Sequence, residues 1–152
     1  TEFTLEHGGR TRRYLVHAPP NAAAGTPRAV VLSLHGGSGN ADAQVAISGL
    51  NPVADRRGFL AVYPEGTGAK VKQAVVGSWN AGGCCPPANE DRVDDVGFIA
   101  AVLDDLEKNF TLDRRRIYAS GFSNGAQMAY RLACDLSDRI AAIGPIAGQG
   151  VF

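Results

Sequence analysis

The sequence predicts an α/β protein in which a mostly parallel sheet of about six strands carries helices on both faces. Three observations favour this class: short apolar β-branched runs, amphipathic segments between them, and glycine clusters at the junctions. Strands that alternate with helices at this spacing are typical of right-handed crossovers and parallel pairing. The 152 residues suffice for one domain with a buried core, 1–152.

The first half of the chain supplies a hairpin, two buried strands and a helix. Alternating apolar and polar residues indicate the hairpin, whose turn is His7-Gly8-Gly9. The run RAVVLSL is typical of a strand buried on both faces. In chain order we expect strands at 2–6, 12–17 and 28–34, a helix at 41–57, a strand at 59–63 closed by Pro64, and a long loop through Gly83 and Pro87.

The second half shows helical periodicity after Val93. One face of this helix is apolar, and the opposite face carries charged residues. Its apolar residues are Val96, Ile99, Ala100, Leu103, Leu106 and Phe110. A short strand follows at 116–119, then a helix with small residues from Ala126 to Cys134, and a last strand at 140–146.

Composition argues against nucleic-acid and membrane partners, and the cysteines indicate an oxidising compartment. Lys plus Arg and Asp plus Glu are both 15, so net charge is zero and nucleic acid is not an expected partner. The longest apolar runs are far below the roughly 20 residues that span a bilayer. The first residues lack the regions of a signal peptide. Because Cys84 and Cys85 are adjacent, Cys134 is the easier disulfide partner for either of them. A disulfide indicates an oxidising compartment, so a secreted or extracytoplasmic location is expected. The alternative is that all three cysteines are buried free thiols.

The pattern G-x-S-x-G occurs at Gly121 to Gly125, between a predicted strand and a predicted helix. This context is that of a nucleophile elbow, a turn so sharp that Ser123 takes a strained backbone conformation. Side chains at Gly121 and Gly125 would strike the neighbouring strand and helix. The N–H of Asn124 at the start of the helix would face developing negative charge. A catalytic Ser123 is therefore favoured over a plain turn.

A second glycine-rich segment, His35-Gly36-Gly37-Ser38, directly follows the buried strand. Acyl-transfer enzymes of this layout place their other oxyanion donor there. We expect the backbone N–H of Gly37 to be this donor, with Ser38 as the fallback by one residue and a candidate for substrate binding. His35 is expected to hold the loop from behind rather than to act as the base.

Five ordered blocks resemble the α/β-hydrolase esterases grouped with polyhydroxybutyrate depolymerases and feruloyl or acetylxylan esterases. The blocks are LHGGSGN (34–40), YPEG (63–66), SWNAGGCC (78–85), VDDVGFIAAVLDDL (93–106) and the run from GFSNG to PIAG (121–148). The resemblance implies an α/β-hydrolase fold, Ser123 as nucleophile, and Asn124 and Gly37 as the oxyanion hole. It also implies hydrolysis of short acyl, hydroxycinnamoyl or polyester substrates, small or polymeric, through an acyl-enzyme.

Other residues leave two interpretations open. Trp79, in the long loop, is a candidate for substrate binding or a loop anchor. Asp94 and Asp95 are interpreted as helix capping rather than as a catalytic or metal site. No cofactor or metal is expected, because the histidines form no zinc pattern with the cysteines. The run Arg114 to Arg116 is interpreted as a solvated turn.

The sequence departs from the resembled family after Ser123. The triad acid and histidine of this fold follow the nucleophile in the chain, and neither occurs here. We therefore expect the C-terminal strands of the domain to be missing and the last strand to be an open edge. Three explanations fit these observations: a piece of a longer or cleaved chain, a truncated product that self-associates to cover the edge, and a non-catalytic binding scaffold. The first is favoured.

Overall fold

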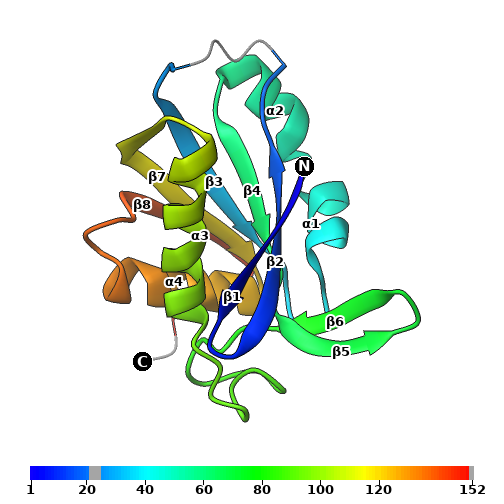
Figure 1. Cartoon of the computed structure of the whole chain (residues 1–152). Helices are drawn as coiled ribbons and strands as arrows, with labels where there is room; N and C mark the ends of the chain where they lie inside the picture. The colour runs from blue at the N-terminus through cyan, green and yellow to red at the C-terminus, as the bar shows by residue number, and fades with distance from the viewer. Residues whose placement is uncertain (21–24, 151–152) are drawn as a thin grey trace.

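The computed structural model describes residues 1–20 and 25–150. A six-stranded sheet in the order β1-β2-β4-β3-β7-β8 forms its centre, and β5 and β6 form a separate hairpin (Figure 1). In chain order the elements are β1 (Glu2–His7), β2 (Arg10–His17), β3 (Arg28–Leu34), α1 (Ala41–Ser48), α2 (Leu50–Arg57), β4 (Leu60–Pro64), β5 (Thr67–Val71), β6 (Ala74–Ser78), α3 (Asp95–Asn109), β7 (Leu112–Phe122), α4 (Asn124–Asp135) and β8 (Ala142–Ile146).

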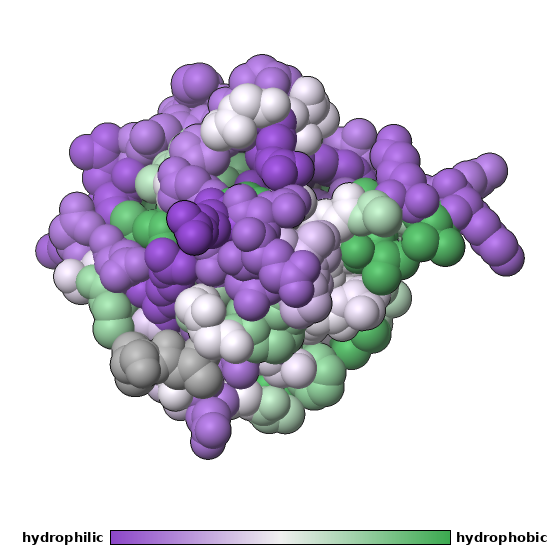
Figure 2. Space-filling view, turned by 90° about the horizontal axis from the view of Figure 1, so that it is seen from below, coloured by the Kyte–Doolittle hydropathy of each residue, from purple (hydrophilic) through white to green (hydrophobic). Residues whose placement is uncertain are grey.

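The pairing confirms the predicted sheet. The leading hairpin β1–β2 is antiparallel and joins the sheet antiparallel to β4, whereas β4, β3, β7 and β8 are mutually parallel. The carboxyl ends of these four strands meet at one edge of the sheet, so the loops that follow them lie together. This edge is the end from which Figure 2 is seen, where hydrophilic residues alternate with separate apolar patches.

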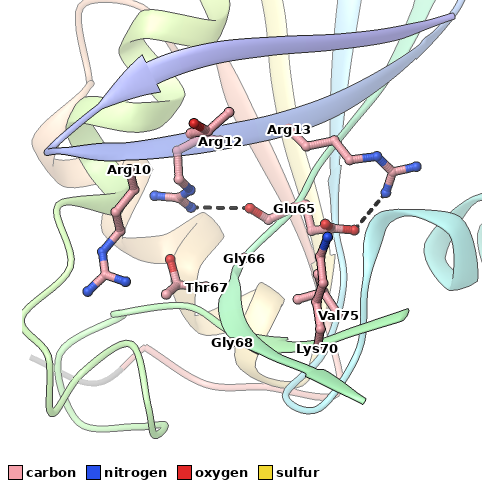
Figure 3. A pocket seen from close by; sticks show the side chains of 10 residues that line it. Arg10, Arg12, Arg13, Glu65, Gly66, Thr67, Gly68, Lys70 and Val75 are labelled. Atoms are coloured by element: carbon pink, nitrogen blue, oxygen red, sulfur yellow. Dashed lines mark hydrogen bonds and ion pairs between the residues drawn. The ribbon is translucent and has the colours of Figure 1, made fainter. Parts of the chain in front are cut away.

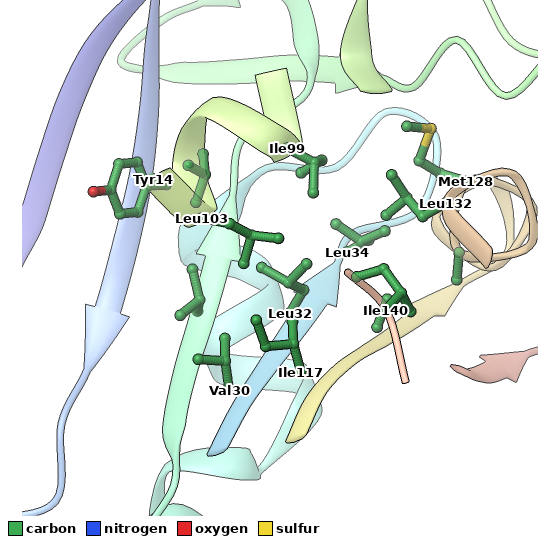
Figure 4. Close-up of a cluster of buried hydrophobic side chains, with 14 of the residues drawn as sticks. Tyr14, Val30, Leu32, Leu34, Ile99, Leu103, Ile117, Met128, Leu132 and Ile140 are labelled. Atoms are coloured by element: carbon green, nitrogen blue, oxygen red, sulfur yellow. The ribbon is translucent and has the colours of Figure 1, made fainter. Parts of the chain in front are cut away.

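Successive side chains of each strand point to opposite faces of the sheet, and each face carries a hydrophobic core. Leu60 and Val62 of β4 face the larger core, under α3 and α4, while Ala61 and Tyr63 face the smaller core, under α1 and α2. Figure 4 shows the larger core, where α3 contributes Ile99 and Leu103 and α4 contributes Met128 and Leu132. The buried face of α3 also includes Phe98 and Val102, so it is rotated from the predicted face toward residues that the periodicity left out.

Three element predictions are wrong in detail. The helix expected at 41–57 is two helices, because Gly49 adopts φ 61°, a left-handed conformation that ends α1. The long loop contains the hairpin β5–β6, turned at residues 72–73. The arginine run lies within β7 rather than in a turn, between Leu112 and Ile117, where the register with β3 shifts. Its three residues are exposed, as expected, and Arg114 pairs with Glu107 and Arg116 with Asp113.

The last strand, β8, is an edge of the sheet and pairs only with β7 among the described residues. Ile146 at its end and Phe122, its neighbour in β7, are both about half exposed. Within residues 1–20 and 25–150, no helix is both long and apolar enough to cross a membrane.

Candidate active site

Ser123 lies at the turn between β7 and α4, and its backbone is strained. Its φ of 53° and ψ of −117° fall where side chains are rarely tolerated, at a cost of about 1–3 kcal/mol. A Cβ at Gly121 would collide with the carbonyl of Gly125, and one at Gly125 would collide with the carbonyl oxygens of Leu34 and His35. The turn therefore requires both glycines, and it leaves the side chain of Ser123 exposed rather than capping α4.

The glycine-rich loop after β3 passes directly beside this turn. A Cβ at Gly36 would lie 3.6 Å from the Cβ of Ser123, and one at Gly37 would lie 3.7 Å from the Cβ of Asn124. Within the described part of the chain, no hydrogen-bond acceptor is paired with the backbone N–H of Gly37 or of Asn124. The first N–H groups of a helix have no partner inside the helix. The structure thus brings together the serine and the two amides that the sequence singled out.

The side chain of Asn124 fixes the start of α4 against the 78–85 loop. Its Oδ1 accepts a 2.7 Å hydrogen bond from the backbone N–H of Trp79, and its Nδ2 donates to the carbonyls of Trp79 (3.1 Å) and Cys84 (3.4 Å). The side chain is buried. Sequence analysis assigned Asn124 a role through its backbone alone and missed this second function, which depends on a residue 45 positions away.

His35 is a structural residue of the glycine-rich loop after β3 (residues 35–39). Gly66 N–H donates to its Nε2 at 2.9 Å, so the ring proton is on Nδ1, which donates to the carbonyl of Gly36 at 2.7 Å. The ring is 1% exposed, and burial lowers the pKa of His35 to about 4. Both nitrogens are engaged and the ring is neutral at pH 7, as expected for a histidine that holds the loop from behind.

The β5–β6 hairpin, which the sequence analysis missed, braces the same loop. Gly77 N–H donates to the carbonyl of Gly39 at 2.9 Å, and Asn40 Nδ2 donates to the carbonyl of Val75 at 3.1 Å. Asn40 also caps α1 through the N–H of Ala43. The glycine-rich loop is therefore fixed on one side by His35 and on the other by this hairpin.

Trp79 is fully buried, which contradicts the expected substrate contact. Its indole N–H donates to the carbonyl of His35 at 2.9 Å, and its ring packs on the His35 imidazole with centroids 5.0 Å apart. It is the loop anchor, the alternative interpretation. Ser38 is exposed beside Gly37, with φ 61°, so it remains a candidate for substrate binding.

The predicted pairing of Cys134 with Cys84 or Cys85 is wrong. Cys84 and Cys85 form a disulfide with each other, and Cys134 is free and exposed on α4. The pair lies at the site, since a Cβ at Gly37 would be 4.0 Å from Cys85 Sγ.

The two aspartates at the start of α3 have different roles. Asp94 caps the helix through the N–H of Gly97 at 2.9 Å, as predicted. Asp95 is buried and pairs with the buried Arg12 at 2.7 Å, so the capping interpretation is wrong for it. Its other oxygen accepts a hydrogen bond from the backbone N–H of Asn80 and ties α3 to the 78–85 loop.

The other two histidines are paired away from the serine. His7 Nε2 lies 2.9 Å from Asp94, and His17 Nε2 lies 2.7 Å from Asp55. Among the described residues, neither a histidine nor a carboxylate is hydrogen bonded to the hydroxyl of Ser123. The strained turn at Ser123 and the glycine-rich loop therefore lie side by side, and no described side chain acts as a hydrogen-bonded base on the serine.

Known proteins match this chain over nearly its whole length. NocK of Nocardia uniformis subsp. tsuyamanensis is 40% identical over 144 residues, which cover 93% of this chain and 39% of NocK. The bifunctional acetylxylan esterase/xylanase XynS20E of Neocallimastix patriciarum is 31% identical over 145 residues, covering 95% of this chain and 19% of that protein. The chain therefore spans less than half the length of these relatives.

Solved structures share the fold. The acetyl xylan esterase from Aspergillus awamori superposes with a TM-score of 0.75 at 17% identity, over 99% of this chain and 53% of that one. The arrangement is the α/β-hydrolase fold that the sequence predicts. The profile of the family described as Esterase PHB depolymerase matches residues 12–152. The chain belongs to the Esterase PHB depolymerase family.

Proposed function

We propose that this chain carries the nucleophile and oxyanion hole of a serine carboxylic-ester hydrolase. One observation carries the proposal: Ser123 is exposed on a strained elbow beside two backbone N–H groups without partners, those of Gly37 and Asn124. A serine of purely structural importance needs neither the strain nor two neighbouring amides without partners.

In the proposed reaction Ser123 Oγ attacks the ester carbonyl, and the carbonyl oxygen becomes an oxyanion that accepts hydrogen bonds from Gly37 and Asn124. The C–O bond to the alcohol then breaks, the alcohol leaves with a proton, and Ser123 holds the acyl group. Water attacks this acyl-enzyme and releases the acid. The buried supports described above hold the two amides in place before charge develops, so little reorganisation is needed during the reaction.

The base that removes the Ser123 proton, and the acid that orients it, are proposed to come from elsewhere in the full-length protein. Two findings support this. The three histidines of the segment are engaged with Gly66, Asp94 and Asp55, and the chain spans only 39% of NocK and 19% of XynS20E. We further propose that the same remaining part, or a second copy, covers the open edge of β8.

The proposed substrates are short acyl, hydroxycinnamoyl or hydroxyalkanoate polyester esters. Relatives named acetylxylan esterase, feruloyl esterase and poly(3-hydroxyalkanoate) depolymerase support these three classes. Phe122, which precedes the serine, and its β8 partner Ile146 have half-exposed apolar side chains, and these would suit an apolar acyl group. The disulfide Cys84–Cys85 supports a secreted or extracytoplasmic location, where disulfides persist.

The test is to incubate the full-length protein with p-nitrophenyl acetate and butyrate and with a fluorophosphonate probe. Ser123→Ala is expected to abolish probe labelling and to lower turnover by roughly a millionfold. Ser137→Ala, which changes another exposed serine, is the matched control and is expected to behave as the wild type. Equal turnover in wild type and Ser123→Ala would refute the proposal, and equal turnover no higher than background would favour a non-catalytic scaffold.

A further inference from the structure

A pocket lined by several charged residues lies between β2 and the β5–β6 hairpin (Figure 3). Its volume is about 370 Å³. It is lined by Arg10, Thr11, Arg12, Arg13, Glu65, Gly66, Thr67, Gly68, Lys70 and Val75. Neither Ser123 nor the two amides beside it belong to this lining, so the proposed ester chemistry does not use it.

Two buried polar groups of the pocket have no partner in the described part of the chain. Arg12 is 4% exposed, and its Nη2 donates to Asp95 and to the carbonyl of Glu65, whereas its Nη1 donates to nothing. The hydroxyl of Thr67 is likewise buried and unpaired. Buried polar groups are nearly always hydrogen bonded, so two such groups lining one pocket indicate a missing partner.

Positive charge predominates around Arg12 Nη1 and the Thr67 hydroxyl. Arg10 is half exposed and held by one contact of 3.3 Å to Asp91, which leaves most of its donors free. The carboxylate of Glu65 is taken by Arg13 at 2.8 Å and by the N–H of Ala41 at 3.3 Å. Figure 3 shows Arg10, Arg12 and the Thr67 hydroxyl turned toward a common space, with Lys70 on the hairpin beyond.

The pairing of Arg12 with Asp95 does not fully compensate the buried charge. Burial is the largest effect on the guanidinium and lowers the pKa of Arg12, although Asp95 acts in the opposite direction. A further anion near Nη1 would offset this cost, because charges in a low-dielectric interior interact strongly. A water molecule would satisfy one donor without supplying charge, and its share of volume, about 30 Å³, is small against this pocket.

We propose that this pocket binds a small oxyanion, held by Arg10, Arg12 Nη1 and the Thr67 hydroxyl. All three groups can donate hydrogen bonds, and an acceptor-only ligand with two or three oxygens complements them. Planar guanidinium groups suit carboxylate and tetrahedral oxyanions alike. Arg10, which is half exposed, supplies the donors on the solvent side of the pocket.

The experiment measures anion binding to the full-length protein by isothermal titration calorimetry and by thermal unfolding at constant ionic strength. Acetate, sulfate and phosphate are each titrated against chloride as the background salt. Thr67→Val removes the hydroxyl with little change of shape, and Arg10→Gln removes the flexible cation. Arg115→Gln is the control, because it removes an equal charge from a fully solvated side chain that lacks a close partner.

We expect saturable binding of acetate, or of sulfate and phosphate, with a rise of several degrees in the unfolding midpoint at saturation. Thr67→Val and Arg10→Gln are expected to weaken binding at least tenfold, and Arg115→Gln is expected to bind as the wild type. Absence of saturable binding by all three anions would overturn the proposal. So would equal affinity in wild type, Thr67→Val and Arg10→Gln, which would show general charge screening.

Discussion

Replacement of His35 by Gln is expected to remove a loss of stability that the wild-type protein shows on the acid side of neutrality. The imidazole is almost fully buried and neutral, with Nε2 accepting from Gly66 and Nδ1 donating to Gly36. Gln cannot be protonated in this range, and its side-chain oxygen can accept from the same Gly66 amide. The substitution therefore removes the protonation of residue 35 while keeping the hydrogen bond from Gly66 that supports the loop.

The magnitude follows from the two pKa values of the histidine. The ordinary value of 6.5 applies to the unfolded chain, and burial lowers the pKa of His35 to about 4 in the folded protein. Between these values the unfolded state binds the proton and the folded state does not, so the free energy of unfolding falls as pH falls. At ~1.36 kcal/mol per pH unit, the total loss by pH 4 is about 3 kcal/mol.

The assay is urea unfolding of wild type and His35→Gln at intervals from pH 8 to pH 4. Above pH 6.5 the two stability curves are expected to be parallel, which serves as the internal control. Between pH 6.5 and 4 the wild-type curve is expected to fall by about 3 kcal/mol more than that of the variant. Parallel curves across the acid window would refute the reasoning, because they would mean that folding does not shield His35 from protonation.

Three further substitutions test the supports of the site by urea unfolding. Gly125→Ala places a methyl group against the carbonyl oxygens at the end of β3 and is expected to cost about 2–3 kcal/mol; a loss below 0.5 kcal/mol would contradict the tight elbow. Asn124→Ala leaves the buried backbone groups of Trp79 unpaired, with an expected loss of roughly 2–4 kcal/mol; an unchanged midpoint would argue against the clamp. Arg12→Met leaves the buried Asp95 without its partner and is expected to lower the free energy of unfolding by about 3–5 kcal/mol. The double variant Arg12→Met/Asp95→Leu is expected to recover much of this loss. Strict additivity of Arg12→Met and Asp95→Leu would contradict a direct pair.

Elements with a strong local pattern were predicted well. The buried run of β3, the leading hairpin and the helix after Val93 follow from hydrophobic periodicity, which is a property of neighbouring residues. The hairpin β5–β6 was missed because its strands are largely exposed and short, so burial imposes no regular alternation on them. The break at Gly49 was missed because a single glycine inside a helical pattern is also tolerated without a break.

The residues of the candidate site likewise fall into those that local sequence could assign and those that depend on distant contacts. Gly121, Ser123 and Gly125 could be assigned from five consecutive letters, because the steric limits of a strand-to-helix turn act within those residues. The burial of Trp79 and the partner of Asp95 could not, since each depends on a group distant in sequence.

The sequence by itself determined the strands of the central sheet, the helices α3 and α4, and the position of a strained, glycine-flanked serine, because backbone sterics and periodicity act over a few residues. Only the tertiary structure decided that His35 is a neutral support, that Trp79 is an anchor and that Arg12 and Thr67 share a pocket. Desolvation and hydrogen-bond pairing set these roles, and both depend on which distant segments the fold brings into contact.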